Sequence, residues 1–364
     1  MFRILAVNPG SSSTKIAVFD DQKNVMTLNI SHSESDLDTL HNFEEQFEYR
    51  KDAILKALAD NGILLDSICA VVGRGGMMSP VQSGAYRVNE EMKQDLINCP
   101  KYHASNLGAL LADDLAGRAS APAYVYDPVS VDEMWDLTRL TGLPGVERTS
   151  VGHVLNMRAV ARQWAEAHNR QYEKVTMIVA HLGSGITISL HHNGRIVDMI
   201  SDDEGPFGPE RAGLIPARKL IQHIYDHKMN RKQAFDALQG KSAGLYGLLG
   251  IANTIEVEAK IAAGDQKALL CYEAMAFNVA KAIGQLATEV SGKVDQIILT
   301  GGTAFSPMFT GWVKDRVSFI AGVEIMPGEW EMEAMAAGVL RVLQGKDTAN
   351  TYSQCERPPL LGEQ

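Results

Sequence analysis

The alternation of apolar and polar positions predicts two similar hairpins, one at the start of the chain and one near its middle. In the first, short β-branched runs flank the polar turn Asn-Pro-Gly-Ser-Ser-Ser-Thr-Lys at residues 8–15. In the second, residues 175–190 form two apolar strands around a Gly-Ser-Gly turn at 183–185. Close-spaced β-branched runs of this length favour strands over helices. Asn193-Gly194 then predicts a further hairpin, because this pair suits the tight turns between antiparallel strands.

Longer apolar patterns fill the rest of the chain with alternating strands and helices. We expect further strands at 24–30, 68–72, 124–127 and 297–300, and helices near 43–58, 103–115, 151–168, 268–290 and 331–343. Alternation of this kind is typical of an α/β protein. Since a hairpin of the same kind opens each half, we predict two related domains that face each other and share a cleft.

The predicted domain limits follow from these elements. We place the first domain at 1–148, completed by a C-terminal helix at 331–345, because a Thr-Gly-Leu-Pro-Gly run within 140–148 suits a linker. The second domain spans 149–330. Prolines and polar residues after 345 predict a loose tail at 346–364.

Both turns have the composition of a phosphate-binding turn. Glycine lets the backbone approach an anion, and turn amides and hydroxyls donate to phosphate oxygens. An isolated Gly-Ser-Ser-Ser is equally well explained as a polar surface turn, but its repetition in the second hairpin favours phosphate. The first turn is not a Walker A loop, because a strand and not a helix follows it. A third turn, Gly301-Gly302-Thr303, follows a buried-type strand and fits a nucleotide-binding turn.

Composition narrows the class of function. The 364 residues carry a net charge of −10, which disfavours a nucleic-acid partner. The four cysteines are widely spaced and lack a Cys-x-x-Cys pair, so neither a zinc site nor a disulfide framework is indicated. The chain opens on a strand and not on a signal peptide, and no apolar run approaches the ~18 residues of a membrane helix. We therefore expect a cytoplasmic protein without a membrane partner.

The three glycine turns together resemble those of the acetate and sugar kinase, Hsp70 and actin superfamily. Motifs at 72–76, 103–108, 125–133 and 204–211 resemble the butyrate kinase branch of the acetokinase family. The similarity keeps the same order from about residue 2 to residue 343. It implies an α/β fold of two related actin-like (ribonuclease H-like) domains around a nucleotide cleft.

The resemblance also implies roles for individual residues. It assigns the nucleotide phosphates to Asn8, Ser11, Ser13, Lys15, Gly183, Ser184, Gly185, Gly301, Gly302 and Thr303. It makes Arg74, Asp127, His181 and Arg211 catalytic, Arg74 and His103 substrate-binding, and Asp127 and Glu331 metal-linked, with Glu329 and Glu333 as competitors of Glu331. A guanidinium suits carboxylate and phosphate because its fork binds either of them bidentately. Taken alone, Arg74 could be a surface charge, His103 a structural residue and Asp127 a turn cap.

The implied reaction needs ATP and Mg²⁺. The γ-phosphoryl group would pass reversibly to the carboxylate of a short-chain fatty acid, with butanoate favoured, to give an acyl phosphate and ADP. The alternatives are an acetate, propionate or branched-chain acid kinase, or a non-catalytic nucleotide-gated binding protein of the same fold. The family also implies a homo-oligomer, with a dimer favoured.

One segment departs from the family pattern. Asn253 stands where these kinases carry an acidic residue, and Ile255 where they carry an arginine that flanks the adenosine end of the nucleotide. Asn253 is neutral and Ile255 offers only apolar contact. We expect weaker ATP binding or relaxed base selectivity, unless a nearby residue such as Lys260 compensates.

Overall fold

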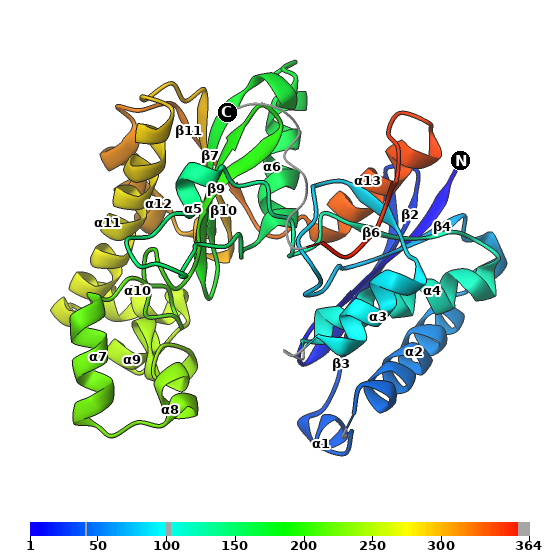
Figure 1. The fold of residues 1–364 in the computed structure, drawn as a ribbon, viewed down its shortest axis with the longest axis horizontal. Coiled ribbons are helices and arrows are strands. Elements are labelled where there is room, and N and C mark those ends of the chain that lie inside the picture. The colour runs from blue at the N-terminus through cyan, green and yellow to red at the C-terminus, as the bar shows by residue number, and fades with distance from the viewer. Residues whose placement is uncertain (41, 100–102, 356–364) are drawn as a thin grey trace. The chain divides into compact units, whose positions relative to one another are not determined.

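The computed structural model describes residues 1–40, 42–99 and 103–355, and it divides the chain into two compact units (Figure 1). Residues 134–329 form the second unit, and the other described residues form the first. This division differs from the predicted limit at residue 148. Residues 134–148 fold with the second unit, where the amide of Trp135 donates to the carbonyl of Val197 and Arg148 pairs with Asp198.

The first unit is built on a seven-stranded sheet in the order β12-β5-β6-β4-β1-β2-β3. Its strands are β1 (Arg3–Pro9), β2 (Ser13–Asp20), β3 (Lys23–Ser31), β4 (Ala70–Gly73), β5 (Ala85–Arg87), β6 (Ala123–Tyr126) and β12 (Asn350–Thr351). Its helices are α1 (Glu34–Leu37), α2 (Phe43–Asp60), α3 (Glu90–Asn98), α4 (Leu107–Ala119) and α13 (Glu331–Leu343). β1, β2 and β3 are antiparallel neighbours, whereas β4 and β6 continue the sheet parallel to β1. The carboxyl ends of β1, β4 and β6 therefore meet at one edge.

The second unit repeats this arrangement in a five-stranded sheet of order β11-β10-β7-β8-β9. Its strands are β7 (Thr176–Leu182), β8 (Ile186–His192), β9 (Arg195–Ile200), β10 (Gln296–Gly301) and β11 (Val323–Pro327). Its helices are α5 (Asp136–Arg139), α6 (Val154–Ala167), α7 (Ala217–Asp226), α8 (Arg231–Asp236), α9 (Gly244–Leu249), α10 (Thr254–Ala262), α11 (Gln266–Glu289) and α12 (Pro307–Val317). Again three antiparallel strands come first and two parallel strands follow. The prediction of two related α/β domains is confirmed.

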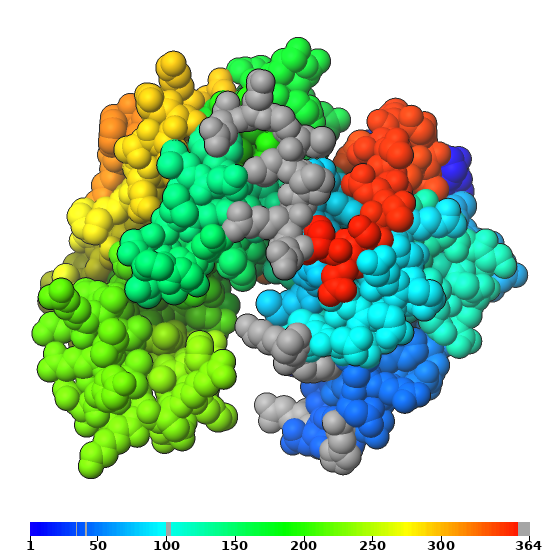
Figure 2. Space-filling view, viewed as in Figure 1, coloured from blue at the N-terminus to red at the C-terminus, as the bar shows by residue number. Residues whose placement is uncertain are grey.

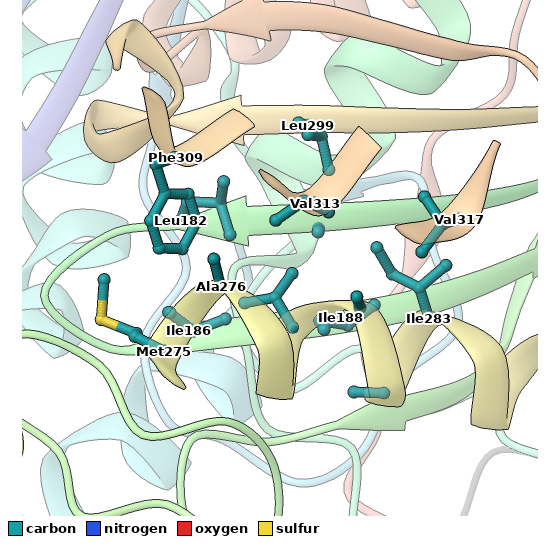
Figure 3. Close-up of a cluster of buried hydrophobic side chains, with 14 of the residues drawn as sticks. Leu182, Ile186, Ile188, Met275, Ala276, Ile283, Leu299, Phe309, Val313 and Val317 are labelled. Carbon is teal, nitrogen blue, oxygen red and sulfur yellow. The ribbon is translucent and has the colours of Figure 1, made fainter. Parts of the chain in front are cut away.

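The core of the second unit lies between its sheet and the long helix α11 (Figure 3). Met275, Ala276 and Ile283 of α11 pack towards Ile186 and Ile188 of β8. α12 closes the same cluster with Phe309, Val313 and Val317, all of which are buried. The helix predicted at 268–290 is thus confirmed, with one face buried in this core while Leu270 and Phe277 are exposed.

The apolar pattern did not predict helices α7 to α10 of the second unit, nor did it predict α5, α12 and β11. Helices α7 to α10 form the green and light-green lobe of this unit in Figures 1 and 2. α7 has no buried residue at all, and Ile221 and Tyr225 on it are 55% and 77% exposed. Each helix of this lobe is only six to ten residues long, shorter than the ~11–18-residue window over which helical periodicity is read. Across the ranges that the structure describes, no helix combines the length and apolarity needed to cross a bilayer.

The described part of the C-terminal segment is not a loose tail, so that prediction is wrong for residues 350–352. β12 pairs with β5, and Tyr352 behind it is fully buried. The Tyr352 hydroxyl donates to Asp95, and the same carboxylate accepts the amide of Ser79 at 2.7 Å. The rest of the predicted tail, 356–364, lies outside the described residues. The C-terminal strand therefore fastens the loop between β4 and β5.

A buried charge network ties the start of the second unit to its core. Arg148 donates to Glu204 through Nε and Nη2 at 2.8 and 2.9 Å, and to Asp198 at 3.1 Å. Asp198 is 1% exposed, and the Glu289 carboxyl at the end of α11 lies beside it. Burial and the neighbouring Asp198 carboxylate raise the pKa of Glu289 well above its ordinary value of 4.5. We therefore expect Glu289 to be protonated in the folded protein at neutral pH.

Glu289 should make stability fall as pH rises. The unfolded chain releases this proton near the ordinary pKa while the folded chain keeps it, so above that pH folding takes up a proton. Glu289→Gln keeps a neutral donor without this uptake. It should be more stable than the wild type, with a gap that widens by up to ~1.4 kcal/mol per pH unit between about pH 5 and pH 8.

Urea unfolding of both proteins across this pH range measures the gap. Glu273→Gln is the matched control, because its carboxylate lies on the same helix but is 43% exposed. The control should give a nearly constant difference from the wild type. A constant difference for Glu289→Gln as well would mean that Glu289 is ionised in the folded state.

Candidate active site

The first predicted phosphate turn links β1 to β2 in the first unit. The turn is closed by the Gly10 amide, which donates to the Ser13 carbonyl at 2.7 Å. Ser11 is exposed, and Lys15 stands opposite Asn8 in the strand register. The structure therefore brings Asn8, Ser11, Ser13 and Lys15 together around one turn.

A buried arginine that the sequence analysis did not identify supports this turn from behind. Arg50 of α2 is 1% exposed and donates to the carbonyls of Ser11 and Ser13 at 3.2 and 3.1 Å. It also donates to the Thr14 hydroxyl at 2.9 Å, which lies 2.8 Å from Nε2 of His32. Burial and the Arg50 charge lower the pKa of His32 to about 4, so this ring is neutral at pH 7. Arg50 fixes the turn and adds positive charge beneath it.

Arg74, Asn8 and Glu331 form a connected group where β1 and β4 end. Arg74 follows β4, and its guanidinium pairs with Oε1 of Glu331 at the first position of α13. Oε2 of Glu331 accepts from the Asn8 amide at 2.7 Å. The Nε–H of Arg74 is buried and has no hydrogen-bond partner among the described residues. Since a buried donor is rarely left unpaired, this N–H is well suited to an anionic ligand.

The same geometry distinguishes Glu331 from its two competitors. Glu329 and Glu333 are both exposed, whereas Glu331 is largely buried against Arg74 and Asn8. Glu329 follows the end of β11, and Glu333 lies on the exposed face of α13. Glu331 is therefore the glutamate that belongs to this group.

Glycines allow the segment that carries His103 to pack directly on the Arg74 loop. A Cβ at Gly73 would collide with the carbonyl of Gly108, and a Cβ at Gly76 would collide with Asn106. The Asn106 side chain, 1% exposed, also accepts the Met77 amide at 2.9 Å. His103 precedes this contact and accepts the Ser105 amide on Nδ1 at 3.2 Å. The structure thus brings the substrate residues predicted from the two motifs onto one edge of the first unit.

Asp127 lies at the end of β6 in a strained conformation. Its φ is +39°, which is uncommon for a residue with a side chain and is further disfavoured before a proline. Its carboxylate Oδ1 accepts the Gly84 amide at 2.7 Å, and it is 1% exposed. Strain of this kind persists where the surrounding structure holds it and is concentrated at functional sites. Pro128 packs where a Cβ on Gly75 would lie, so Asp127 is next to the Arg74 loop.

The carboxylates on this edge suit magnesium in kind. Mg²⁺ takes hard oxygen ligands and is usually held by one or two carboxylates together with water and phosphate. Asp127 offers a carboxylate of this type. Both oxygens of Glu331 already bind Arg74 and Asn8, so its first role here is to hold these two side chains. Within the described ranges, no cluster of three or more His, Cys, Asp and Glu residues could hold a metal by itself.

His181 is the second-last residue of β7 in the second unit and leads into the second predicted phosphate turn. The ring is 2% exposed, and its Nδ1 lies 2.9 Å from the amide nitrogen of Asn156 on α6. A second histidine, His153, stacks on it with ring centroids 3.9 Å apart and planes 11° apart. A Cβ placed on Gly183 would lie 3.0 Å from Nε2 of His181, so this nitrogen is close to the turn.

The third glycine turn lies beside the second. Thr300 of β10 pairs with His181 in the parallel register. Gly301 has φ +89°, and a Cβ there would lie 2.7 Å from the carbonyl of Leu182, so only glycine fits this close approach. A Cβ on Gly302 would meet open space, and Thr303 follows in a short 3₁₀ turn. The two predicted nucleotide turns are thus neighbours.

Arg211 lies in the loop 201–216, which folds back on the Gly-Ser-Gly turn. The Glu210 amide donates to the Ser184 carbonyl at 3.0 Å. Arg211 pairs with Asp202 at 3.0 Å, and a Cβ on Gly185 would lie 2.7 Å from the same carboxylate. The guanidinium is about one-third exposed. Arg211 therefore belongs to the same group as His181 and the turn.

The two residues that depart from the family pattern lie at the start of α10. Asn253 is the N-cap of this helix, and its Oδ1 accepts the Ile255 amide at 2.9 Å. Ile255 is 78% exposed. The effect of these residues on nucleotide binding stays a prediction.

Sequence reasoning missed the residues that hold the site from behind, among them Arg50, Asn156 and His153. Arg50 stands in a charged run, and Asn156 and His153 stand at the start of a helix whose apolar face was the visible signal. Buried positions of α2 and α6 carry polar residues, but the sequence alone does not tell which positions are buried.

Comparisons with known proteins identify the family and the fold. The model of the acetokinase family matches residues 145–326. Butyrate kinase 2 of Clostridium acetobutylicum is 43% identical over 354 residues, which cover 96% of this chain and 99% of that protein. Among solved structures, an acetate kinase from Porphyromonas gingivalis superposes with a TM-score of 0.76 at 18% identity, covering 94% of this chain and 100% of that one.

A propionate kinase from Francisella tularensis gives a TM-score of 0.75 at 18% identity, covering 93% of this chain and 99% of that one. At such low identity the two solved structures establish the fold. The 43% identity to the Clostridium protein over almost the full length of both chains establishes the relationship. The chain belongs to the acetokinase family.

Proposed function

We propose that this protein is a kinase that transfers the γ-phosphoryl group of ATP reversibly to the carboxylate of a short-chain fatty acid, with butanoate as the preferred acid. The observation that carries the proposal is Arg74, anchored by Glu331 and left with a buried Nε donor that lacks a partner among the described residues. A carboxylate is the planar anion that a guanidinium fork fits. The identity to butyrate kinase 2 supports the choice of butanoate.

The chemistry asks for positioning and charge neutralisation. A carboxylate oxygen of the acid forms a bond to the γ-phosphorus, the bond from that phosphorus to the β-γ bridging oxygen breaks, and its electron pair leaves with ADP. No proton moves, because the acid is already ionised at neutral pH, so no general base is required. Transfer through a loose transition state depends on electrostatic stabilisation.

Each unit supplies part of this stabilisation. Arg74, with His103 nearby, binds and orients the acyl carboxylate. Asn8, Ser11, Ser13 and Lys15 donate to phosphate oxygens in the first unit, and Gly183, Ser184, Gly185, Gly301, Gly302 and Thr303 do so in the second. Arg211 neutralises charge on the transferring phosphoryl group, and His181 contacts the same group. Magnesium, when bound, would neutralise charge on the nucleotide phosphates. Asp127 would hold its hydration shell, and Glu331 would be a second metal-linked carboxylate.

The direct test is trapping of the acyl phosphate. Hydroxylamine converts it to a hydroxamate, so the protein with butanoate, ATP and Mg²⁺ should give hydroxamate and ADP in equal amounts. Binding of ATP without hydroxamate would favour the non-catalytic binding protein. A cytoplasmic location and a homodimer stay predictions from the family resemblance.

Arg211→Ala should lower kcat by at least ~10²-fold, because a contact that neutralises transition-state charge is worth ~2.7–4 kcal/mol. Steady-state kinetics with butanoate measure the loss. Arg218→Ala is the control, since Arg218 is an exposed arginine of α7 close in sequence. Near-normal turnover in a folded Arg211→Ala protein would show that Arg211 serves only the structure of its loop.

Glu331→Gln should raise KM for butanoate by about tenfold or more, because Arg74 loses a charged partner worth ~1.5–3 kcal/mol. The Mg²⁺ concentration needed for half-maximal rate should change little if anchoring Arg74 is its main role. Glu333→Gln, an exposed neighbour on the same helix, should change neither value. A large rise in the Mg²⁺ requirement with an unchanged KM for butanoate would instead make Glu331 a metal-linked residue.

The value of kcat/KM should rise from acetate through propionate to butanoate. Each methylene that fits an apolar pocket gains up to ~0.8 kcal/mol, or up to about fourfold in kcat/KM. The measurement is a comparison of the three acids at saturating ATP. Equal or better activity with acetate would overturn the preference for butanoate and leave the kinase proposal standing.

A further inference from the structure

Asn156 is a buried amide that neither the apolar pattern of its helix nor the proposed reaction explains. It lies in the first turn of α6, is fully buried, and has the buried residues Leu155 and Met157 on either side in the chain. Its amide nitrogen lies 2.9 Å from Nδ1 of His181 and 3.3 Å from the hydroxyl oxygen of Thr300. A polar group that is taken out of water needs such partners, since leaving it unpaired is costly.

The direction of these hydrogen bonds fixes the proton on His181. The Thr300 hydroxyl donates to the Gly328 carbonyl at 3.3 Å, so its oxygen accepts from Asn156. The same amide nitrogen has only hydrogens to offer to His181, so Nδ1 accepts. A neutral imidazole that accepts on Nδ1 carries its proton on Nε2.

The ring is also held from its face. His153 stacks on His181, and its own Nδ1 lies 3.0 Å from the Thr187 hydroxyl on the neighbouring strand. The stack fixes the plane of the His181 ring, and Asn156 fixes the rotation within that plane. Nε2 then lies by the Gly183–Gly185 turn, where a Cβ on Gly183 would approach it to 3.0 Å.

We infer that Asn156 is a positioning residue that keeps His181 protonated on Nε2, so that the ring presents a donor to an anionic oxygen at the Gly183–Gly185 turn. The catalytic half of this inference rests on the proposed function, in which His181 contacts the transferring phosphoryl group. With the other tautomer, Nε2 would present a lone pair to that oxygen, and the contact would be repulsive. The bridge to Thr300 aligns the same amide with the strand that leads into Gly301 and Gly302.

Nitrogen-15 NMR of histidine ring nitrogens in the full-length protein tests the tautomer directly. His181 is assigned by the signals that disappear in His181→Gln. The wild type should show Nε2 protonated and Nδ1 unprotonated at neutral pH. Asn156→Asp offers an acceptor of the same size, so it should place a proton on Nδ1. A wild-type spectrum with the proton on Nδ1 would overturn the inference, and this readout does not depend on which acid is phosphorylated.

Kinetics test the link to catalysis. Asn156→Leu should lower kcat by about tenfold with little change in KM for ATP, because a misplaced His181 ring loses its contact to the phosphoryl group in the transition state. The same substitution in a His181→Gln background should cause little further loss, since Asn156 acts through His181. Equal losses in both backgrounds would mean that Asn156 serves packing alone.

Asn278→Leu is the matched control, because this amide bonds the Ala274 carbonyl of its own helix. It should change neither the tautomer nor kcat. If the wild type forms no acyl hydroxamate, the proposed function fails, whereas the NMR result still decides the tautomer.

Discussion

Each unit depends on one topological constraint: its central strand pairs with an antiparallel hairpin partner on one side and a parallel strand on the other. Every residue of β7 is buried, and β1 is buried along most of its length, so the polar residues at their carboxyl ends can meet a ligand only at the sheet edge. The parallel neighbours β4, β6 and β10 end at the same edges. Asn8, Arg74 and Asp127 in one unit, and His181 and Thr300 in the other, are therefore gathered by strand order and not by proximity in sequence.

Electrostatics explain how an acidic protein can bind anions. The net charge is −10, yet the groups at the turns are mostly cations and amides held by nearby acids. Glu331 holds Arg74 and Asp202 holds Arg211, so each guanidinium is oriented before any ligand arrives. Arg50 adds a charge that stays behind the backbone. This preorganisation lowers the entropic cost of ordering a long side chain on binding.

The sequence was informative wherever a local pattern decided the structure. Both hairpins, the helix 331–343 and α11 follow from short-range periodicity and turn residues. Arg50 and Asn156 could not be predicted, because their roles depend on partners that are far away in the chain. β12 was missed for a similar reason, since two residues gain their strand pairing only from β5. The lobe of α7 to α10 was missed because its helices are only six to ten residues long, shorter than the ~11–18-residue window over which helical periodicity is read.

The C-terminal strand that buries Tyr352 has a consequence for synthesis on the ribosome. The first unit contains the first strand of the chain, but α13 and β12, which pack on its sheet, are translated last. The second unit is continuous in sequence and ends at residue 329, just before α13 begins. At ~5–20 residues per second, the N-terminal hairpin, which ends at Asp20, waits roughly 17–66 s for Thr351 at the end of β12. The second unit is thus fully translated before the first, although the first begins earlier.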